Sequence, residues 1–121
     1  MVIKESKLLV VDNSNFKSGR CIHIFGGSKN KVASVGDFVL VSVKNNLKKK
    51  KLRTKMYLGV VSSVKFNIRR NSGNFIRFDT NTMLLFSDKE NLLGTKLFGP
   101  VDFVLRKHSL LRVPLLGRHV V

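Results

Sequence analysis

Three arginines bracket a turn signal in the middle of the chain. Arg69 and Arg70 precede Asn71-Ser72-Gly73-Asn74, and Arg77 follows it. Asn, Ser and Gly suit tight turns, so the pattern predicts a β-hairpin with guanidinium groups near its tip. Because a guanidinium pairs bidentately with a phosphate, this hairpin is suited to binding folded RNA. On these residues alone, ordinary solvent-facing arginines on a hairpin are an equally good interpretation.

A second cationic segment precedes the hairpin. Lys48, Lys49, Lys50 and Lys51 stand in succession, and Arg53 and Lys55 follow them. Like charges at this density resist packing, so we predict an exposed loop or ribbon tip that contacts nucleic acid. The alternative is a solvated linker. The other candidate nucleic-acid-binding cations are Lys17, Arg20 and Lys44.

The charge balance makes a polyanion the expected partner. The 121-residue chain has 23 Lys and Arg against 7 Asp and Glu, a net charge of +16. Solubility of a small domain needs only about 2–8 net charges, so nucleic acid is the leading partner. An anionic membrane surface is the rival, but the lysines cluster in one segment and do not form a basic amphipathic helix. The one cysteine, Cys21, is expected to be a small core residue in a reducing compartment.

No catalytic or metal-binding constellation is recognisable in the sequence. The histidines His23, His108 and His119 lack metal-ligand spacing among themselves and with Cys21. The aspartates that stand beside turn residues, where carboxylates commonly accept backbone hydrogen bonds, are Asp12, Asp37 and Asp79. We therefore expect neither an enzyme nor a cofactor.

Strand-like segments recur about every dozen residues, with turn signals between them. They are expected at 7–11, 20–25 and 38–43, and the arginine-tipped hairpin supplies the fourth and fifth within 57–86. No long helical period interrupts them, which predicts a mainly β fold, a small closed or partly closed β-barrel. Alternation places Ile22 with Ile24 on one strand face. It likewise groups the apolar residues that open the hairpin, Val64, Phe66 and Ile68.

The pattern changes after 87–91. A glycine-bracketed loop runs from 94 to 100, and apolar runs at 103–105 and 110–111 predict one or two short helical turns. Pro114 and Gly117 prevent a long C-terminal helix. We expect a single domain over 1–121, with the barrel at about 1–88 and a loop and short helical part at about 89–121.

Five blocks of sequence together resemble a known family. They are Asp12-Asn13-Ser14; Cys21-Ile22 with Gly26-Gly27-Ser28; Val35-Gly36-Asp37; a central block with Gly59-Val60-Val61, Ser72-Gly73, Ile76-Arg77-Phe78-Asp79, Asn81 and Leu84-Leu85; and Gly94-Thr95-Lys96-Leu97-Phe98-Gly99-Pro100-Val101. From Lys7 to about Leu111 the chain resembles the universal large-subunit ribosomal proteins of the L-fourteen family, in their bacterial and organellar form. The departures are Asn15 in place of a usual glycine, Ser62 in an apolar triplet, a denser lysine run and the last ten residues.

The resemblance implies a five-stranded β-barrel with a projecting β-ribbon and small C-terminal helices. It also implies binding to large-subunit rRNA, contacts with neighbouring large-subunit proteins, and an intersubunit bridge with small-subunit rRNA. In bacteria and mitochondria, a ribosome-silencing factor docks near the Gly-Thr-Lys-Leu-Phe loop of this family. Thr95, Lys96 and Arg112 are therefore candidates for a protein-partner interface, on the silencing-factor or small-subunit side.

A free single-stranded nucleic-acid-binding β-barrel is the alternative function. Such modules present stacking aromatics on an exposed sheet face, whereas the phenylalanines here are expected mainly at core-facing positions and there is no tryptophan. Within the ribosomal hypothesis, abundant Lys, Asn and Phe suggest an AT-biased gene, as in many organelle genomes, and a transit peptide has no room before the first expected strand. Both features fit an organelle-encoded protein or a bacterial cytoplasm. With the divergent last ten residues, we expect a mitochondrial ribosome in the matrix, with a plastid or a bacterial cytoplasm as alternatives.

Replacing Lys48, Lys49, Lys50 and Lys51 with glutamine should weaken rRNA binding or subunit assembly and leave the barrel folded. Fewer counterions are released when fewer cations meet phosphates, so the affinity should also depend less steeply on salt. Binding to large-subunit rRNA at several salt concentrations measures the affinity and its salt dependence, and circular dichroism reports on the fold. Loss of β-structure in this variant would contradict the prediction.

Overall fold

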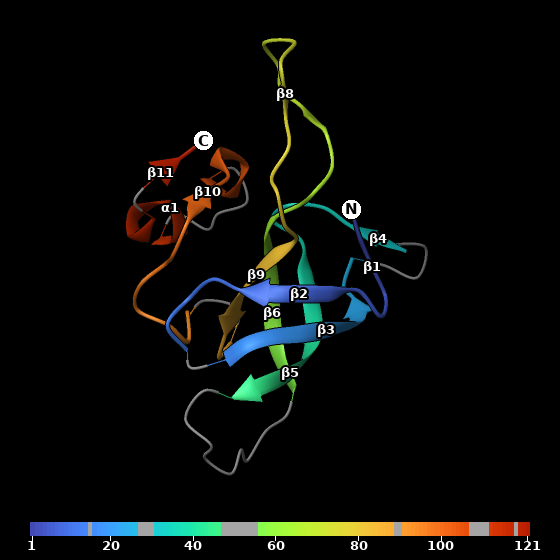
Figure 1. The fold of residues 1–121 in the computed structure, drawn as a ribbon, viewed down its shortest axis with the longest axis vertical. Helices are drawn as coiled ribbons and strands as arrows, with labels where there is room; N and C mark the ends of the chain where they lie inside the picture. The colour runs from blue at the N-terminus through green and yellow to red at the C-terminus, as the bar shows by residue number, and fades with distance from the viewer. Residues whose placement is uncertain (15, 27–30, 47–55, 89–90, 107–111, 118) are drawn as a thin grey trace.

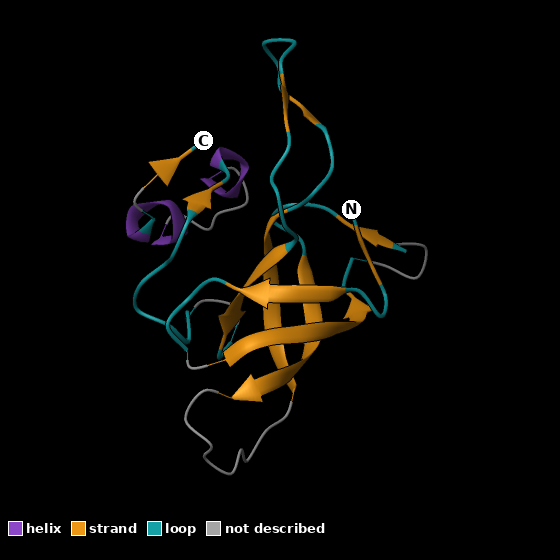
Figure 2. Ribbon diagram, in the orientation of Figure 1, coloured by secondary structure: helices purple, strands orange, loops and turns teal. Residues whose placement is uncertain are grey.

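A closed five-stranded β-barrel forms the centre of the molecule (Figures 1 and 2). Its strands, in their order around the barrel, are β2 (Lys7–Val10), β3 (Phe16–Ile24), β5 (Phe38–Asn46), β6 (Met56–Ser63) and β9 (Thr82–Phe86). Neighbours pair antiparallel except β2 and β9, whose parallel pairing closes the barrel. This computed structural model describes residues 1–14, 16–26, 31–46, 56–88, 91–106, 112–117 and 119–121. The mainly β fold expected from the sequence is confirmed.

Shorter elements lie outside the barrel strands. The two-stranded pairs are β1 (Val2–Ile3) with β4 (Val32–Ala33), β7 (Ile68–Arg69) with β8 (Phe75–Ile76), and β10 (Pro100–Val101) with β11 (His119–Val120). The C-terminal part adds a 3-10 turn, η1 (Phe103–Arg106), and one helix, α1 (Arg112–Leu116). Pro114 falls within the first turn of α1, where a missing N–H is tolerated. In the described part of the chain, no helix is long and apolar enough to cross a bilayer.

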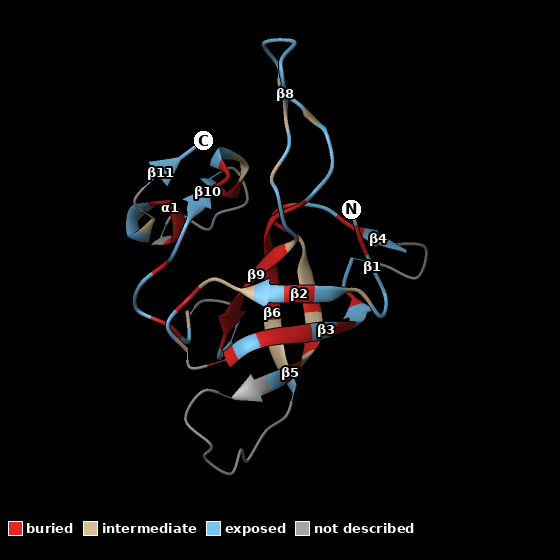
Figure 3. Ribbon diagram, viewed as in Figure 1, coloured by how far each residue is buried: buried red, intermediate tan, exposed pale blue. Residues whose placement is uncertain are grey.

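Buried residues are concentrated on the barrel strands (Figure 3). The largest fully buried side chains of these strands are Leu8, Ile24, Val39, Val41, Val60, Val61, Met83, Leu84 and Leu85, and Val64, directly after β6, is also fully buried. Every residue of β9 is buried, which requires cover on both of its faces. The barrel core covers one face. The chain after β9 folds back beside the strand, where the Leu93 N–H donates to the Leu85 carbonyl at 2.9 Å.

Two irregularities in the ladder change which side chains face the core. The register between β3 and β5 shifts between Cys21 and His23. Cys21 and Ile24 are therefore buried and Ile22 is exposed, so the expectation that Ile22 and Ile24 share a face was wrong. A bulge inserts an extra residue and inverts the alternation. Burial raises the pKa of the Cys21 thiol, with Lys4 opposing and Glu5 assisting the shift, which fits the core position expected for it.

The second irregularity lies in β6, between Val61 and Ser63. It places the hydroxyls of Ser62 and Ser63 beside Thr82 of β9, and both hydrogen-bond to the Thr82 Oγ1. The polar residue at 62, which departs from the family pattern, is therefore satisfied inside the barrel wall. A buried hydroxyl without such a partner would lose the free energy of its bonds to water.

The strand expected through Val64, Phe66 and Ile68 was also wrong. The strand β6 ends at Ser63, Val64 is buried and Phe66 is half exposed. The Lys65 N–H donates to the Asn81 side-chain oxygen at 2.7 Å and not to a neighbouring strand. This hydrogen bond turns the chain out of the barrel before β7 begins.

The phenylalanines do not lie mainly in the core. Five of the nine are exposed: Phe25, Phe66, Phe75, Phe98 and Phe103. A narrow five-stranded barrel is already filled by valines and leucines, so bulky rings are left outside it. The positions of the phenylalanines therefore do not argue against base stacking, contrary to the expectation from the sequence.

Gly19 of β3 lies where the barrel wall has no room for a side chain. A Cβ there would stand 2.7 Å from the Met83 Cε and 2.9 Å from the Ser42 carbonyl oxygen. We expect Gly19→Ala to lower the free energy of unfolding by about 1–3 kcal/mol, because the Ser42 backbone is fixed in the ladder. Gly59→Ala is the matched control, since its Cβ would meet Leu84 and Val41 at an ordinary 3.5 Å. Urea denaturation measures the free energy of unfolding of both variants. An equal destabilisation of the two would contradict the steric explanation.

Candidate nucleic-acid interface

Exposed cations lie on the barrel strands β2, β3 and β5. Lys7 and Arg20 are directly opposite each other in the ladder. Lys44 lies opposite Ser18 and so shares the face of Arg20, whereas Lys17 alternates to the other face of β3. Glu5 lies 3.4 Å from the Arg20 guanidinium, but both side chains are more than half exposed, so this ion pair stabilises little. Lys7 was missed from the sequence, because its place beside Arg20 depends on the register of the two strands.

The lysine-rich segment joins β5 to β6. Its cations, Lys48, Lys49, Lys50, Lys51, Arg53 and Lys55, lie outside the described residues. Their interpretation as a nucleic-acid contact therefore stays a prediction.

A β-ribbon of β7 and β8 projects from one end of the barrel (Figure 1). Its tip is a tight turn in which the Arg70 N–H donates to the Asn74 carbonyl at 2.8 Å and the Gly73 N–H donates to the Arg70 carbonyl at 3.0 Å. Gly73 has a φ of 86°, a conformation that favours glycine. The hairpin predicted from the turn signal is thus confirmed, with Arg69 directly opposite Phe75.

The three arginines of this ribbon do not share one environment. Arg69 and Arg77 are exposed to solvent. Only 16% of the Arg70 side chain is exposed, and its Nη2 lies 2.6 Å from Oδ1 of the fully buried Asp102. The sequence pattern does not distinguish the three arginines. In the fold, Arg70 is largely buried and paired with Asp102, whereas Arg69 and Arg77 are exposed.

The Arg70–Asp102 pair joins the ribbon to the C-terminal part of the chain. Arg70 also donates to the Val121 backbone oxygen at 3.0 Å, and Asp102 Oδ1 accepts the Val104 N–H of η1 at 3.0 Å. Removing one partner of a buried ion pair typically costs about 3–5 kcal/mol, because the other charge is left uncompensated. Arg70 therefore orients the ribbon against η1 and β11 and is not a free cation.

Asn13 holds the loop that contains Thr95 and Lys96. Its Oδ1 accepts the backbone N–H of Thr95 at 2.7 Å and that of Lys96 at 3.1 Å, and its Nδ2 donates to the Thr95 Oγ1 at 2.9 Å. Gly94 is required at this contact, since a Cβ there would lie 2.8 Å from the Asn13 Oδ1. Thr95 and Lys96 are thus presented at the surface by a fixed loop, as a partner interface requires. Arg112, the third residue predicted for that interface, begins α1.

Asp12 fixes the turn that carries Asn13. Its buried carboxylate accepts the Ser14 N–H at 3.1 Å and the Ser14 hydroxyl through one oxygen. The other oxygen accepts the Leu85 N–H of β9 at 3.0 Å. The turn-stabilising role expected for Asp12 is confirmed, and the carboxylate also anchors the turn to the barrel wall.

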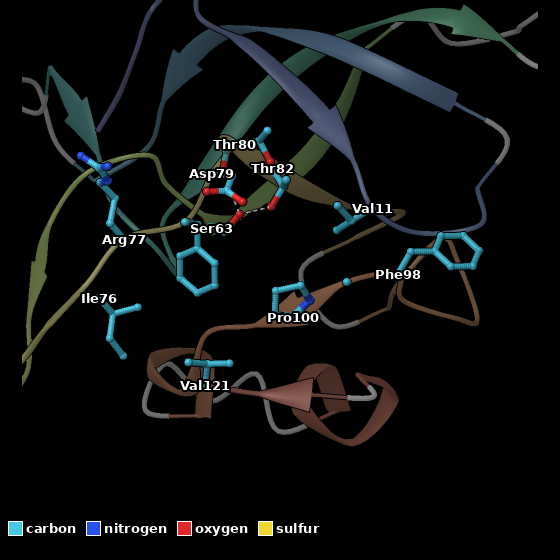
Figure 4. Close-up of a pocket in the computed structure, with 12 residues that line it drawn as sticks. Val11, Ser63, Ile76, Arg77, Asp79, Thr80, Thr82, Phe98, Pro100 and Val121 are labelled. Carbon is cyan, nitrogen blue, oxygen red and sulfur yellow. Dashed lines mark hydrogen bonds between the residues drawn. The ribbon is translucent and has the colours of Figure 1, made fainter.

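A cavity of about 420 Å³ lies between the barrel end, the ribbon base and the C-terminal segment (Figure 4). Ser63, Thr80 and Thr82 line its barrel side, and Pro100 and Val121 line the opposite side. The polar groups on the barrel side already bond one another, since the Ser63 hydroxyl contacts both Thr82 and the Thr80 carbonyl. In the described ranges, no three His, Cys, Asp or Glu side chains gather as a metal site would require.

Comparison with protein families identifies the chain. A family model described as ribosomal protein L14p/L23e matches residues 1–121. The chain belongs to this family. It is a protein of the large ribosomal subunit, and its family is structural and not catalytic.

Two blocks of the L14p/L23e resemblance are in direct contact in the fold. Asp12-Asn13-Ser14 and Gly94-Thr95-Lys96 lie about eighty residues apart in sequence and meet through the Asn13 side chain. The antiparallel bridge between Asp12 and Leu97 continues this contact. The two motifs therefore form one structural unit, a turn and the loop that it holds.

Removing the Asn13 side chain should free the 94–96 loop. We expect Asn13→Ala to lower the free energy of unfolding by about 1–3 kcal/mol, because it removes three hydrogen bonds to partly solvated groups. Hydrogen exchange at the Thr95 and Lys96 amides should accelerate in this variant. Asn13→Asp, which keeps the accepting oxygens, should preserve their protection, and Asn74→Ala on the ribbon tip serves as the control. Unchanged exchange in Asn13→Ala would refute the role assigned to Asn13.

Proposed function

We propose that this large-subunit protein binds large-subunit rRNA through the exposed cations of the barrel and the ribbon, and that it contributes to an intersubunit bridge. The barrel is the rigid frame, and the positive charge lies both on its strands and on the segments that leave it. The described cations assigned to the RNA are Lys7, Lys17, Arg20, Lys44, Arg69 and Arg77, and the lysine-rich segment 48–55 extends the set.

The observation that supports this proposal is how the chain uses its few carboxylates. Asp12 and Asp37 accept hydrogen bonds from their own turns, and Asp102 binds Arg70. Asp88 accepts from Asn91. Between described residues, ion pairs join only Arg20 with Glu5 and Arg70 with Asp102. The remaining surface cations therefore need neutralisation from outside the protein, and an RNA backbone supplies one phosphate charge per nucleotide.

Contacts of this kind position RNA more than they read its sequence. Lysine and arginine bind phosphate oxygens, whereas discrimination between RNA sites comes from shape and 2′-hydroxyl contacts. The fixed ribbon and the loop held by Asn13 provide such shape. The roles proposed for the ribbon and for the loop held by Asn13 require no reaction by the protein's own side chains.

The loop held by Asn13 is the proposed protein-partner side. Thr95 and Lys96 are exposed there, and with Arg112 we assign them to contacts with a silencing factor or with the small subunit. We also propose that the ribosome is mitochondrial, on the residue composition, with plastid and bacterial ribosomes as alternatives.

The second candidate function, a free single-stranded nucleic-acid-binding module, is favoured by the exposed phenylalanines. Sedimentation separates the two functions, because an integral subunit component stays with the large subunit at high salt and a free binding module dissociates. Release of the intact protein by high salt would overturn the ribosomal proposal for this chain.

The assignment of cations to RNA is tested by the salt dependence of binding. The variant Lys7→Gln, Arg20→Gln, Arg69→Gln should bind large-subunit rRNA with a shallower slope of log K against log salt. The reduction should be about 0.7–0.9 for each phosphate that is no longer neutralised. The charge-preserving variant with Arg20→Lys and Arg69→Lys should keep the slope. An unchanged slope in the glutamine variant would remove these residues from the interface.

A further inference from the structure

The two faces of the β7–β8 ribbon differ in chemistry. Side chains alternate along a strand, and the register pairs Ile68 with Ile76 and Arg69 with Phe75. Ile68, Ile76 and Arg70 are half-buried, whereas Arg69 and Phe75 are exposed. One face of the ribbon therefore carries the partly buried residues and the other carries the exposed ones. Figure 3 shows both intermediate and exposed residues along the ribbon.

Phe75 is the most exposed phenylalanine among the described residues, at 64%. Among the described residues, the ring–ring and cation–ring contacts involve other aromatics, and none involves Phe75. For example, the Arg106 Cζ lies 5.6 Å from the centre of the Phe103 ring. Single exposed apolar side chains are ordinary. What distinguishes Phe75 is its two exposed arginine neighbours, Arg69 directly opposite in the ladder and Arg77 two residues along the chain.

The ribbon holds the backbone of Phe75 in a defined position. The tip is closed by the backbone hydrogen bonds between Arg70 and Asn74 and between Gly73 and Arg70. The other face is fixed by the ion pair between Arg70 and Asp102. A backbone that is already ordered loses little conformational freedom on binding, so more of the contact free energy of the ring appears as affinity.

We propose that the outward face of this ribbon is a stacking site for an unpaired nucleobase of RNA. The Phe75 ring carries the base, and Arg69 and Arg77 bind the phosphates that flank it. This proposal rests on the rRNA binding proposed above and adds a defined base contact to it. An exposed ring with two arginines as neighbours matches a nucleotide, which offers one flat apolar face and adjacent negative charge. A protein partner would have to supply acidic groups on both sides of an apolar side chain.

The full-length chain and a short single-stranded RNA that contains 2-aminopurine provide the test. Stacking on Phe75 should quench the 2-aminopurine fluorescence. Phe75→Ala should remove the quenching and raise Kd about 5- to 150-fold, the range for removal of one base–aromatic stack. Phe75→Trp should restore both the fluorescence quenching and the affinity. Phe98→Ala, at a phenylalanine that is 59% exposed but lies off the ribbon, is the matched control and should bind as the unsubstituted chain does.

The salt dependence separates this proposal from the one on which it rests. Phe75→Ala should keep the slope of log K against log salt, because it removes no charge, while Arg69→Gln should lower it by about 0.7. Salt-dependent binding with no effect of Phe75→Ala would overturn the stacking site alone. Absence of salt-dependent binding by the unsubstituted chain would overturn both proposals.

A photo-crosslinker tests the same site in the assembled particle. With p-benzoylphenylalanine at position 75, a crosslink to large-subunit rRNA supports the stacking site. A crosslink to a neighbouring protein overturns it and makes the ribbon tip a protein-docking surface. Because Phe75 is exposed and outside the core, none of these substitutions should unfold the barrel.

Discussion

Self-repulsion of positive charge constrains every other feature of this chain. A net charge of +16 on 121 residues opposes compaction, and two of the seven carboxylates that could offset it are used inside the fold. Asp12 and Asp102 are buried, where each fixes backbone geometry and so cannot screen surface lysines. The aliphatic barrel must therefore supply the stability of the free protein, and a polyanion must supply the neutralisation. The aliphatic core residues therefore stabilise the fold, and the surface cations serve assembly with the polyanion.

Three polar contacts hold the outlying segments to the barrel or to one another. Asp12 binds the Leu85 amide of β9, Asn13 binds the 94–96 loop, and Arg70 binds Asp102. Each contact joins parts of the chain that are far apart in sequence. Apolar packing alone would leave such loops free to slide, because it is not directional. The hydrogen bonds set the loop positions, so the surfaces that we propose for RNA need little reordering on binding.

The sequence predicts those features that depend on neighbouring residues. The ribbon turn follows from Asn71 to Asn74, and the barrel follows from the spacing of strands and turns. The bulge after Cys21 could not be predicted, because it depends on how β3 pairs with β5. Asp102, the partner of Arg70, lies 32 residues away in sequence, so this ion pair could not be predicted from the sequence either. The phenylalanines were misassigned for another reason: hydrophobicity places a side chain in the core only while the core has volume left.

The buried charge of Asp102 also gives the ribbon its register. The strands β7 and β8 have two residues each, and so short a ladder specifies its own pairing weakly. A slip of β7 by one residue would turn Arg70 and Ile68 outward and Arg69 inward. Asp102 would then be buried without the guanidinium that compensates it, at a cost of about 3–5 kcal/mol. The ribbon arginine that pairs with Asp102 therefore determines that Arg69, opposite Phe75 in the ladder, faces the solvent.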